Sequence, residues 1–214
     1  MKKFLYIILL ASLSFACDKT ENDETLRAFF FDGRNYLLDD GSAENSWRFT
    51  SNYGGSYGNK FVVNETGVIK RVQIYVVGGG NQNGRKVQID IYNADRELVD
   101  SSSQFEMQQY WQYVELPDVP FSDTFYVMVR WNKEQGNTHF LGCDYNGPNS
   151  KAELNYSIVG GKFNNIPELN PGKEDAKWVF MIRVNANVKN NSEVKNKSVY
   201  YGSEILDGYD VTEK

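Results

Sequence analysis

Apolar and polar residues alternate with a period of two through most of this chain after Glu24, and few stretches fit a helical period. Such alternation is typical of strands with one buried face, because successive side chains of a strand point to opposite faces. Strands are therefore expected at 68–76, 87–92, 110–116, 125–131, 138–143, 152–157 and 178–188. We expect 125–131 to be a central strand, and Pro117 and Pro120 to end the strand that starts at Tyr110. This pattern predicts an all-β, antiparallel β-sandwich of jelly-roll-like type.

The charge and composition exclude several classes of protein. The 23 Lys and Arg residues against 28 Asp and Glu residues give a net charge of −5, which argues against a nucleic-acid partner. An apolar content of 41% is enough for a packed core. One histidine and two cysteines leave little material for metal or nucleophile chemistry.

The N-terminal residues have the pattern of a targeting signal. Lys2 and Lys3 precede an apolar run at 4–16 that is shorter than the roughly 20 residues of a membrane-spanning helix, so 1–16 is expected to be a signal peptide. The residues up to Cys17 resemble the lipobox of bacterial lipoproteins. That resemblance implies that Cys17 is acylated and holds the protein to a lipid bilayer. The alternative is an ordinary cleaved signal followed by a chance cysteine.

The rest of the chain divides into three parts. Residues 17–33 are expected to form an acidic tether, 34–188 the sandwich and 189–214 a polar C-terminal tail. The apolar residues near Val199 favour docking of this tail on the domain, although a partner-binding tail is the alternative. With Cys17 acylated, Cys143 has no disulfide partner.

Two patterns suggest catalysis at first sight. Gly54 to Gly58 matches the G-x-S-x-G motif around Ser56, but a strand rather than a helix is expected after it, so we interpret it as a loop between strands. His139 and Cys143 would lie about 13 Å apart on one strand, too far for a dyad or a shared zinc ion. No catalytic residue is predicted.

An acidic cluster is the candidate metal site. Asp39, Asp40 and Glu44 surround a glycine turn and could supply oxygen ligands to calcium. The favoured interpretation is that the two aspartates form Asx-turns with the backbone, so that no cofactor is required. Residues 144–149 are expected to form a second turn of the same character.

Aromatic residues at or beside expected turns are the candidate ligand-binding residues. They are Tyr53, Tyr57, Tyr110, Trp111 and Tyr145. Aromatic faces beside Asn, Asp and Gln suit a sugar ring, which has apolar C–H surfaces and hydroxyl groups. Packing at the sandwich edges is the alternative role.

Several segments in order resemble one family. The segment 36–47, with Asp39-Asp40-Gly41 and Glu44-Asn45, is similar to the Y-x-D-D-G-T-x-E-N-x-W opening of a peptidase-associated β-sandwich module in secreted proteins and surface lipoproteins of Bacteroidetes-like bacteria. Further segments resemble the same family in the same order: 58–61, 69–75, 111–116, 125–131 and 142–148. The resemblance implies a jelly-roll-like accessory module without catalytic residues. The acidic residues after Cys17 are similar to the export signals of surface lipoproteins of Bacteroidetes-like bacteria, so we expect the anchor to lie in the outer membrane, at the surface of a Gram-negative cell. A glycan or a protein is then the expected ligand. The alternatives are a structural subunit of an outer-membrane assembly and a small hydrolase that uses Ser56 or paired carboxylates.

Overall fold

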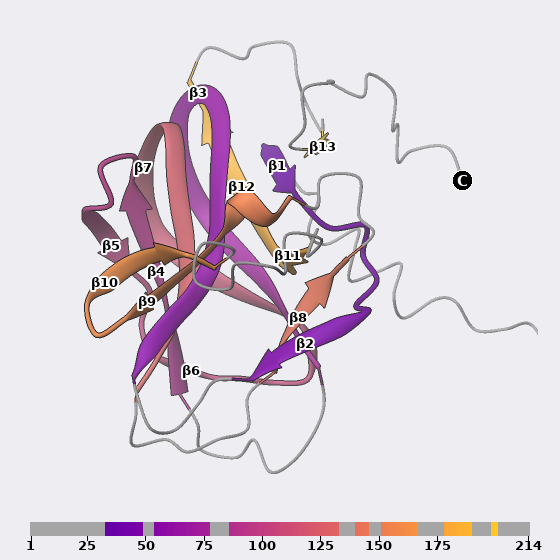
Figure 1. Cartoon of the computed structure of the whole chain (residues 1–214). Helices are drawn as coiled ribbons and strands as arrows, with labels where there is room; N and C mark the ends of the chain where they lie inside the picture. Colours follow the sequence, from indigo (N-terminus) through magenta and orange to yellow (C-terminus); the bar gives the residue numbers. More distant parts are fainter. Residues whose placement is uncertain are drawn as a thin grey trace, which may run out of the picture.

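Two strands of 22 residues each, β3 (Gly55–Val76) and β7 (Tyr110–Trp131), organise the molecule. The computed structural model describes residues 33–48, 54–77, 86–132, 140–145, 151–166, 178–189 and 198–200. The two strands pair antiparallel along their length and arch over at the same end of the molecule (Figure 1), here called the arch.

Backbone irregularities produce the arch. The register of β3 against β7 shifts between Val62 and Thr66, which is a sign of β-bulging and bends the pair. Asn64 and Asp123 lie in this bend with φ of 52° and 44°. Asn and Asp enter this left-handed region more readily than most residues, so the sequence suits the bend.

The bends divide the pairing into two layers. The first layer runs β10, β9, the start of β3, the end of β7, β4 and β5, with β6 beside β4. The second layer runs β13, β1, β12, the end of β3 and the start of β7. Pairing is antiparallel throughout except between β1 and β13, which are parallel.

The remaining elements are short. In the first layer they are β4 (Lys86–Asn93), β5 (Leu98–Ser101), β6 (Phe105–Glu106), β9 (Asn155–Val159) and β10 (Lys162–Asn165). In the second layer they are β1 (Arg34–Leu37), β12 (Ile182–Val188) and β13 (Ser198–Tyr200). A third group joins β8 (Phe140–Asp144) to β2 (Asn45–Arg48) and β11 (Val179–Phe180). One 3-10 turn, Ala152–Leu154, precedes β9.

The prediction that Pro117 and Pro120 end a strand was wrong, because both lie inside β7. This half of β7 pairs with β3 alone among the described strands and so forms an edge of the second layer. Proline is tolerated at an edge, where its missing N–H breaks no ladder. The half of β7 from Phe125 to Trp131 pairs with both β3 and β4, as expected for a central strand.

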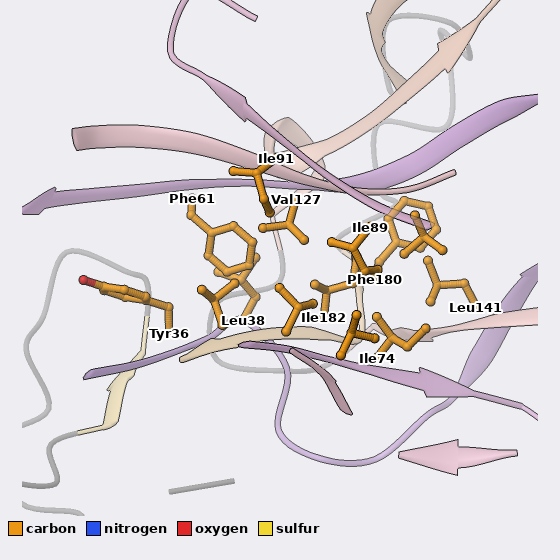
Figure 2. Packing of buried hydrophobic residues seen from close by; sticks show 14 of the residues in the cluster. Tyr36, Leu38, Phe61, Ile74, Ile89, Ile91, Val127, Leu141, Phe180 and Ile182 are labelled. Atoms are coloured by element: carbon orange, nitrogen blue, oxygen red, sulfur yellow. The ribbon is translucent and has the colours of Figure 1, made fainter. Parts of the chain in front are cut away.

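The core lies between the two layers (Figure 2). Ile89, Ile91 and Val127 point inward from the first layer, and Leu38, Ile74 and Ile182 meet them from the second. Aromatic rings fill the core toward the arch. Phe61 and Phe125, which are neighbours in the first layer, stack with their ring centroids 5.2 Å apart. Fully burying each such side chain contributes about 1.5–3 kcal/mol.

The architecture confirms the predicted fold class of an all-β sandwich. Strand β13 lies beside β1, at the edge of the second layer. Within the described ranges there is no helix long and apolar enough to cross a membrane.

Candidate functional site

Three carboxylates from two segments about a hundred residues apart meet at one place, here called the acidic corner: Asp40, Glu44 and Asp144. One oxygen atom from each lies within 4.8 Å of those of the other two. Asp40 and Glu44 are exposed, whereas Asp144 is buried. The pairing of β2 with β8 builds the corner, because Asn45 lies opposite Cys143 and thereby brings Glu44 next to Asp144.

Hydrogen bonds from the chain itself hold these carboxylates. The Asp40 N–H donates to Asp144 Oδ2 at 2.6 Å, and the Tyr145 N–H donates to Glu44 Oε2 at 2.9 Å. The Ser42 N–H donates to Asp40 Oδ1 at 2.9 Å, which is the Asx-turn expected at Asp40. The Ser42 hydroxyl lies 2.7 Å from Asp40 Oδ1 and 2.6 Å from Glu44 Oε1. Calcium binding at this corner stays the alternative interpretation.

Asp39 does not belong to the acidic corner, although it adjoins Asp40 in sequence. Its carboxylate accepts from Arg183 Nη2 at 2.6 Å and from Arg183 Nε at 3.1 and 3.2 Å, and both side chains are buried. The Arg183 guanidinium lies over the Trp111 ring, with its Cζ 4.1 Å from the ring centroid. The Gly41 N–H closes the expected Asx-turn on Asp39 Oδ1 at 3.0 Å. The Asp39 carboxylate therefore forms a buried ion pair with Arg183 and is not part of the acidic corner.

Aromatic rings in contact form a second group beside the acidic corner, here called the aromatic corner: Trp47, Tyr57, Trp178, Phe180 and Tyr145. Trp47 stacks on Trp178 at 5.0 Å and meets Tyr57 edge-on at 5.5 Å. Tyr57 also stacks on Phe180 at 5.7 Å. Tyr57 lies inside β3 rather than at a turn, and its burial raises the pKa of its phenol.

Tyr145 joins the acidic corner to the aromatic corner. Its ring lies edge-on to Trp178 at 6.5 Å, and its hydroxyl accepts a hydrogen bond from Asn45 Nδ2 at 2.7 Å. Its side chain is 38% exposed, so this junction faces solvent. An apolar ring edge, an amide and two exposed carboxylates are thus available within one small area.

The other candidate aromatics lie in a different group. Tyr110 and Trp111 begin β7, where Trp111 meets Tyr75 edge-on at 5.2 Å and Tyr110 lies 6.3 Å from the same ring. Tyr110 is 64% exposed, whereas Trp111 is half-buried over Arg183. The fold therefore separates Tyr110 and Trp111 from Tyr57 and Tyr145. Tyr53 and Cys17 lie outside the described residues.

Ser56 and Cys143, the described members of the two catalytic patterns, are both buried. Ser56 lies within β3, where it pairs with Arg130 and Ile158 and is 1% exposed, so the expected loop is a strand. A nucleophile elbow needs a serine raised on a strand-to-helix turn. Cys143 is buried, and this burial raises the pKa of its thiol well above the usual range. His139 lies outside the described residues.

Sequence reasoning missed Trp47, Trp178 and Asp144 as site residues. The sequence carried a partial signal for two of them, because Trp47 closes the motif that contains Glu44, and Asp144 begins the second acidic turn. Their meeting depends on strand register between segments about a hundred residues apart, which local patterns do not specify.

No protein-family model matches the chain, and a search of curated proteins finds no match.

Proposed function

We propose that this protein is a lipoprotein held by Cys17 at the surface of a Gram-negative cell, whose sandwich binds a glycan without catalysing a reaction. The observation that carries the binding role is Tyr145, an exposed ring fixed between an amide and the acidic corner. The lipobox-like pattern around Cys17 supports the anchor.

The chemistry of a sugar ring matches this junction. One face of a pyranose presents C–H groups that pack on an aromatic ring, and its hydroxyls donate to carboxylates and accept from amides. Tyr145 and the half-buried Trp47 offer ring surface, while Asn45, Asp40 and Glu44 offer the polar partners.

A glycan array tests the binding role. Tyr145→Ala is expected to abolish binding of any glycan that the unaltered chain retains, because it removes both the ring and the fixed hydroxyl. Tyr110→Ala is the matched control, since Tyr110 is a more exposed tyrosine in the other aromatic group. Binding that survives Tyr145→Ala would contradict this site. A blank array would favour the alternative, a structural subunit of an outer-membrane assembly.

A separate measurement tests the anchor. Cys17→Ala is expected to move the protein from the detergent phase to the aqueous phase, because the acylated thiol is lost. Cys143→Ala, which changes the other cysteine, serves as the control and should leave partitioning as it was. Equal partitioning of the Cys17→Ala variant and the unaltered chain would refute the lipid anchor.

A further inference from the structure

A groove of about 370 Å³ opens at the arch, apart from the acidic and aromatic corners. Its floor includes Ile91 and Phe125, which belong to the core between the layers. Val99 of β5 forms part of its wall and is 38% exposed. This volume lies at the lower end of the range for small-molecule sites.

The groove is apolar inside and polar at its rim. Thr66, Ser122 and Thr124 contribute hydroxyl groups from the two arched strands. Lys189 is the one cationic residue type among the described lining residues, and its backbone N–H donates to the Thr66 carbonyl oxygen at 2.8 Å. That bond holds Lys189 at the rim. No ion pair to Lys189 occurs within the described part of the chain.

The charge of the lining differs from that of the whole chain. The chain carries a net charge of −5, yet the described lining of the groove has one cation and no carboxylate. An apolar floor with a single cation at the rim complements a ligand with an apolar body and one anionic head. We propose that the groove at the arch binds a small anionic amphiphile, with its body against Ile91, Phe125 and Val99 and its head near Lys189. This site is independent of the proposed glycan site.

Two fluorescent probes of nearly the same shape test the proposal. Anilinonaphthalenesulfonate carries a sulfonate, and N-phenylnaphthylamine is its uncharged counterpart. The protein used is the full chain with Cys17→Ala. This variant lacks the proposed acyl anchor and needs no detergent, which would otherwise compete with the probes. We expect one saturable site for each probe per chain, with tighter binding of the sulfonate.

Substitutions separate the charge from the apolar body. Lys189→Met should weaken binding of the sulfonate roughly two- to fivefold, the range for a solvent-screened charge pair, and leave the neutral probe unaffected. Lys162→Met, which removes an exposed lysine on β10, should change neither. Val99→Trp should fill the groove and weaken both probes roughly tenfold or more. Leu98→Trp, at a neighbouring exposed residue that does not line the groove, is its matched control.

Three outcomes would overturn the proposal. The first is that Val99→Trp binds both probes as tightly as the unaltered chain does, while its thermal unfolding temperature also equals that of the unaltered chain. The second is an equal effect of Lys189→Met on the charged and the neutral probe. The third is the absence of a saturable site. If Val99→Trp changes the unfolding temperature, Val99→Phe replaces it in the test. We expect the same loss of affinity for both probes from Val99→Phe.

Discussion

At the scale of single residues, two buried amides have opposite surroundings. The Asn59 side chain donates to the Phe180 carbonyl at 2.7 Å and accepts from the Phe180 N–H at 3.2 Å, so it bonds both backbone polar groups of one residue. Gln73 is fully buried on β3, and neither polar atom of its side-chain amide has a hydrogen-bond partner among the residues that the structure describes. A buried amide without a partner loses its hydration and gains nothing in return.

Replacing these amides should therefore change stability in opposite directions. Gln73→Met keeps the size of the side chain and removes the unsatisfied atoms, so we expect the free energy of unfolding to rise by about 1–2 kcal/mol. Asn59→Leu removes these two hydrogen bonds from the Phe180 backbone and should lower the free energy of unfolding by about 2–5 kcal/mol. Urea unfolding measures both. A Gln73→Met variant less stable than the unaltered chain would show that the amide has a bonding partner.

The ion pair of Asp39 and Arg183 gives a second prediction at this scale. Asp39→Asn leaves the buried guanidinium without a counter-charge, and we expect a loss of about 3–5 kcal/mol in the free energy of unfolding. Asp118→Asn is the control, because its bond to Lys70 lies on the surface, and it should change stability by less than about 1 kcal/mol. Similar losses for the two variants, measured by urea unfolding, would contradict the difference in burial.

Sequence reasoning reached part of this site. The Asx-turns of Asp39 and Asp40 were predictable, because they are local contacts between residues two apart. The different partners of these two neighbours could not be predicted, since Arg183, which pairs with Asp39, and Asp144, which bonds the Asp40 N–H, are more than a hundred residues away along the chain. Their pairing depends on strand register, which emerges only when the layers assemble.

At the scale of elements, the long strands were only partly visible in the sequence. The alternation correctly located the end of β3 and the second half of β7. It broke down around Asn64 and Pro117, because bulges and an edge position remove the need for a regular two-residue period. Each long strand was thus expected as shorter pieces. Short strands such as β2 lack an alternating pattern of sufficient length.

The two prolines of β7 also suggest a prediction about association. Unpaired N–H groups of an edge strand can pair with another chain, and proline lacks this donor. The double variant Pro117→Thr and Pro120→Thr should keep the circular dichroism spectrum of the fold but self-associate at high concentration. Ser122→Thr, in the same strand, is the control for the added threonines. Light scattering that finds the double variant as monomeric as the control would contradict this role.

At the scale of the whole molecule, alkaline pH should weaken the arch. Burial raises the pKa of Tyr36 above its ordinary value of about 10, and its 2.6 Å hydrogen bond to Glu65 adds to the effect. The folded state therefore holds this proton more tightly than the unfolded state. The resulting stabilisation is complete below about pH 9 and is lost as the pH rises above about 10.

Tyr36→Phe isolates this contribution. At pH 7 the variant should be less stable than the unaltered chain by about 1–3 kcal/mol, because the bond to the Glu65 carboxylate is lost. The difference should narrow steadily between about pH 10 and pH 11.5 in urea unfolding. Tyr110→Phe, at an exposed tyrosine, should show no such trend. A pH-independent difference for Tyr36→Phe would mean that its phenol ionises equally in both states.

The continuous arch has a mechanical consequence. In a sandwich of two independent sheets, a pulling force can slide one sheet across the other while each stays whole. Here β3 and β7 each cross from one layer to the other, so sliding would first have to straighten the bends at Asn64 and Asp123. Load applied at β1 is passed through β12 to β3, and from there into the opposite layer. Under tension the molecule should resist as one block and then yield in a single step.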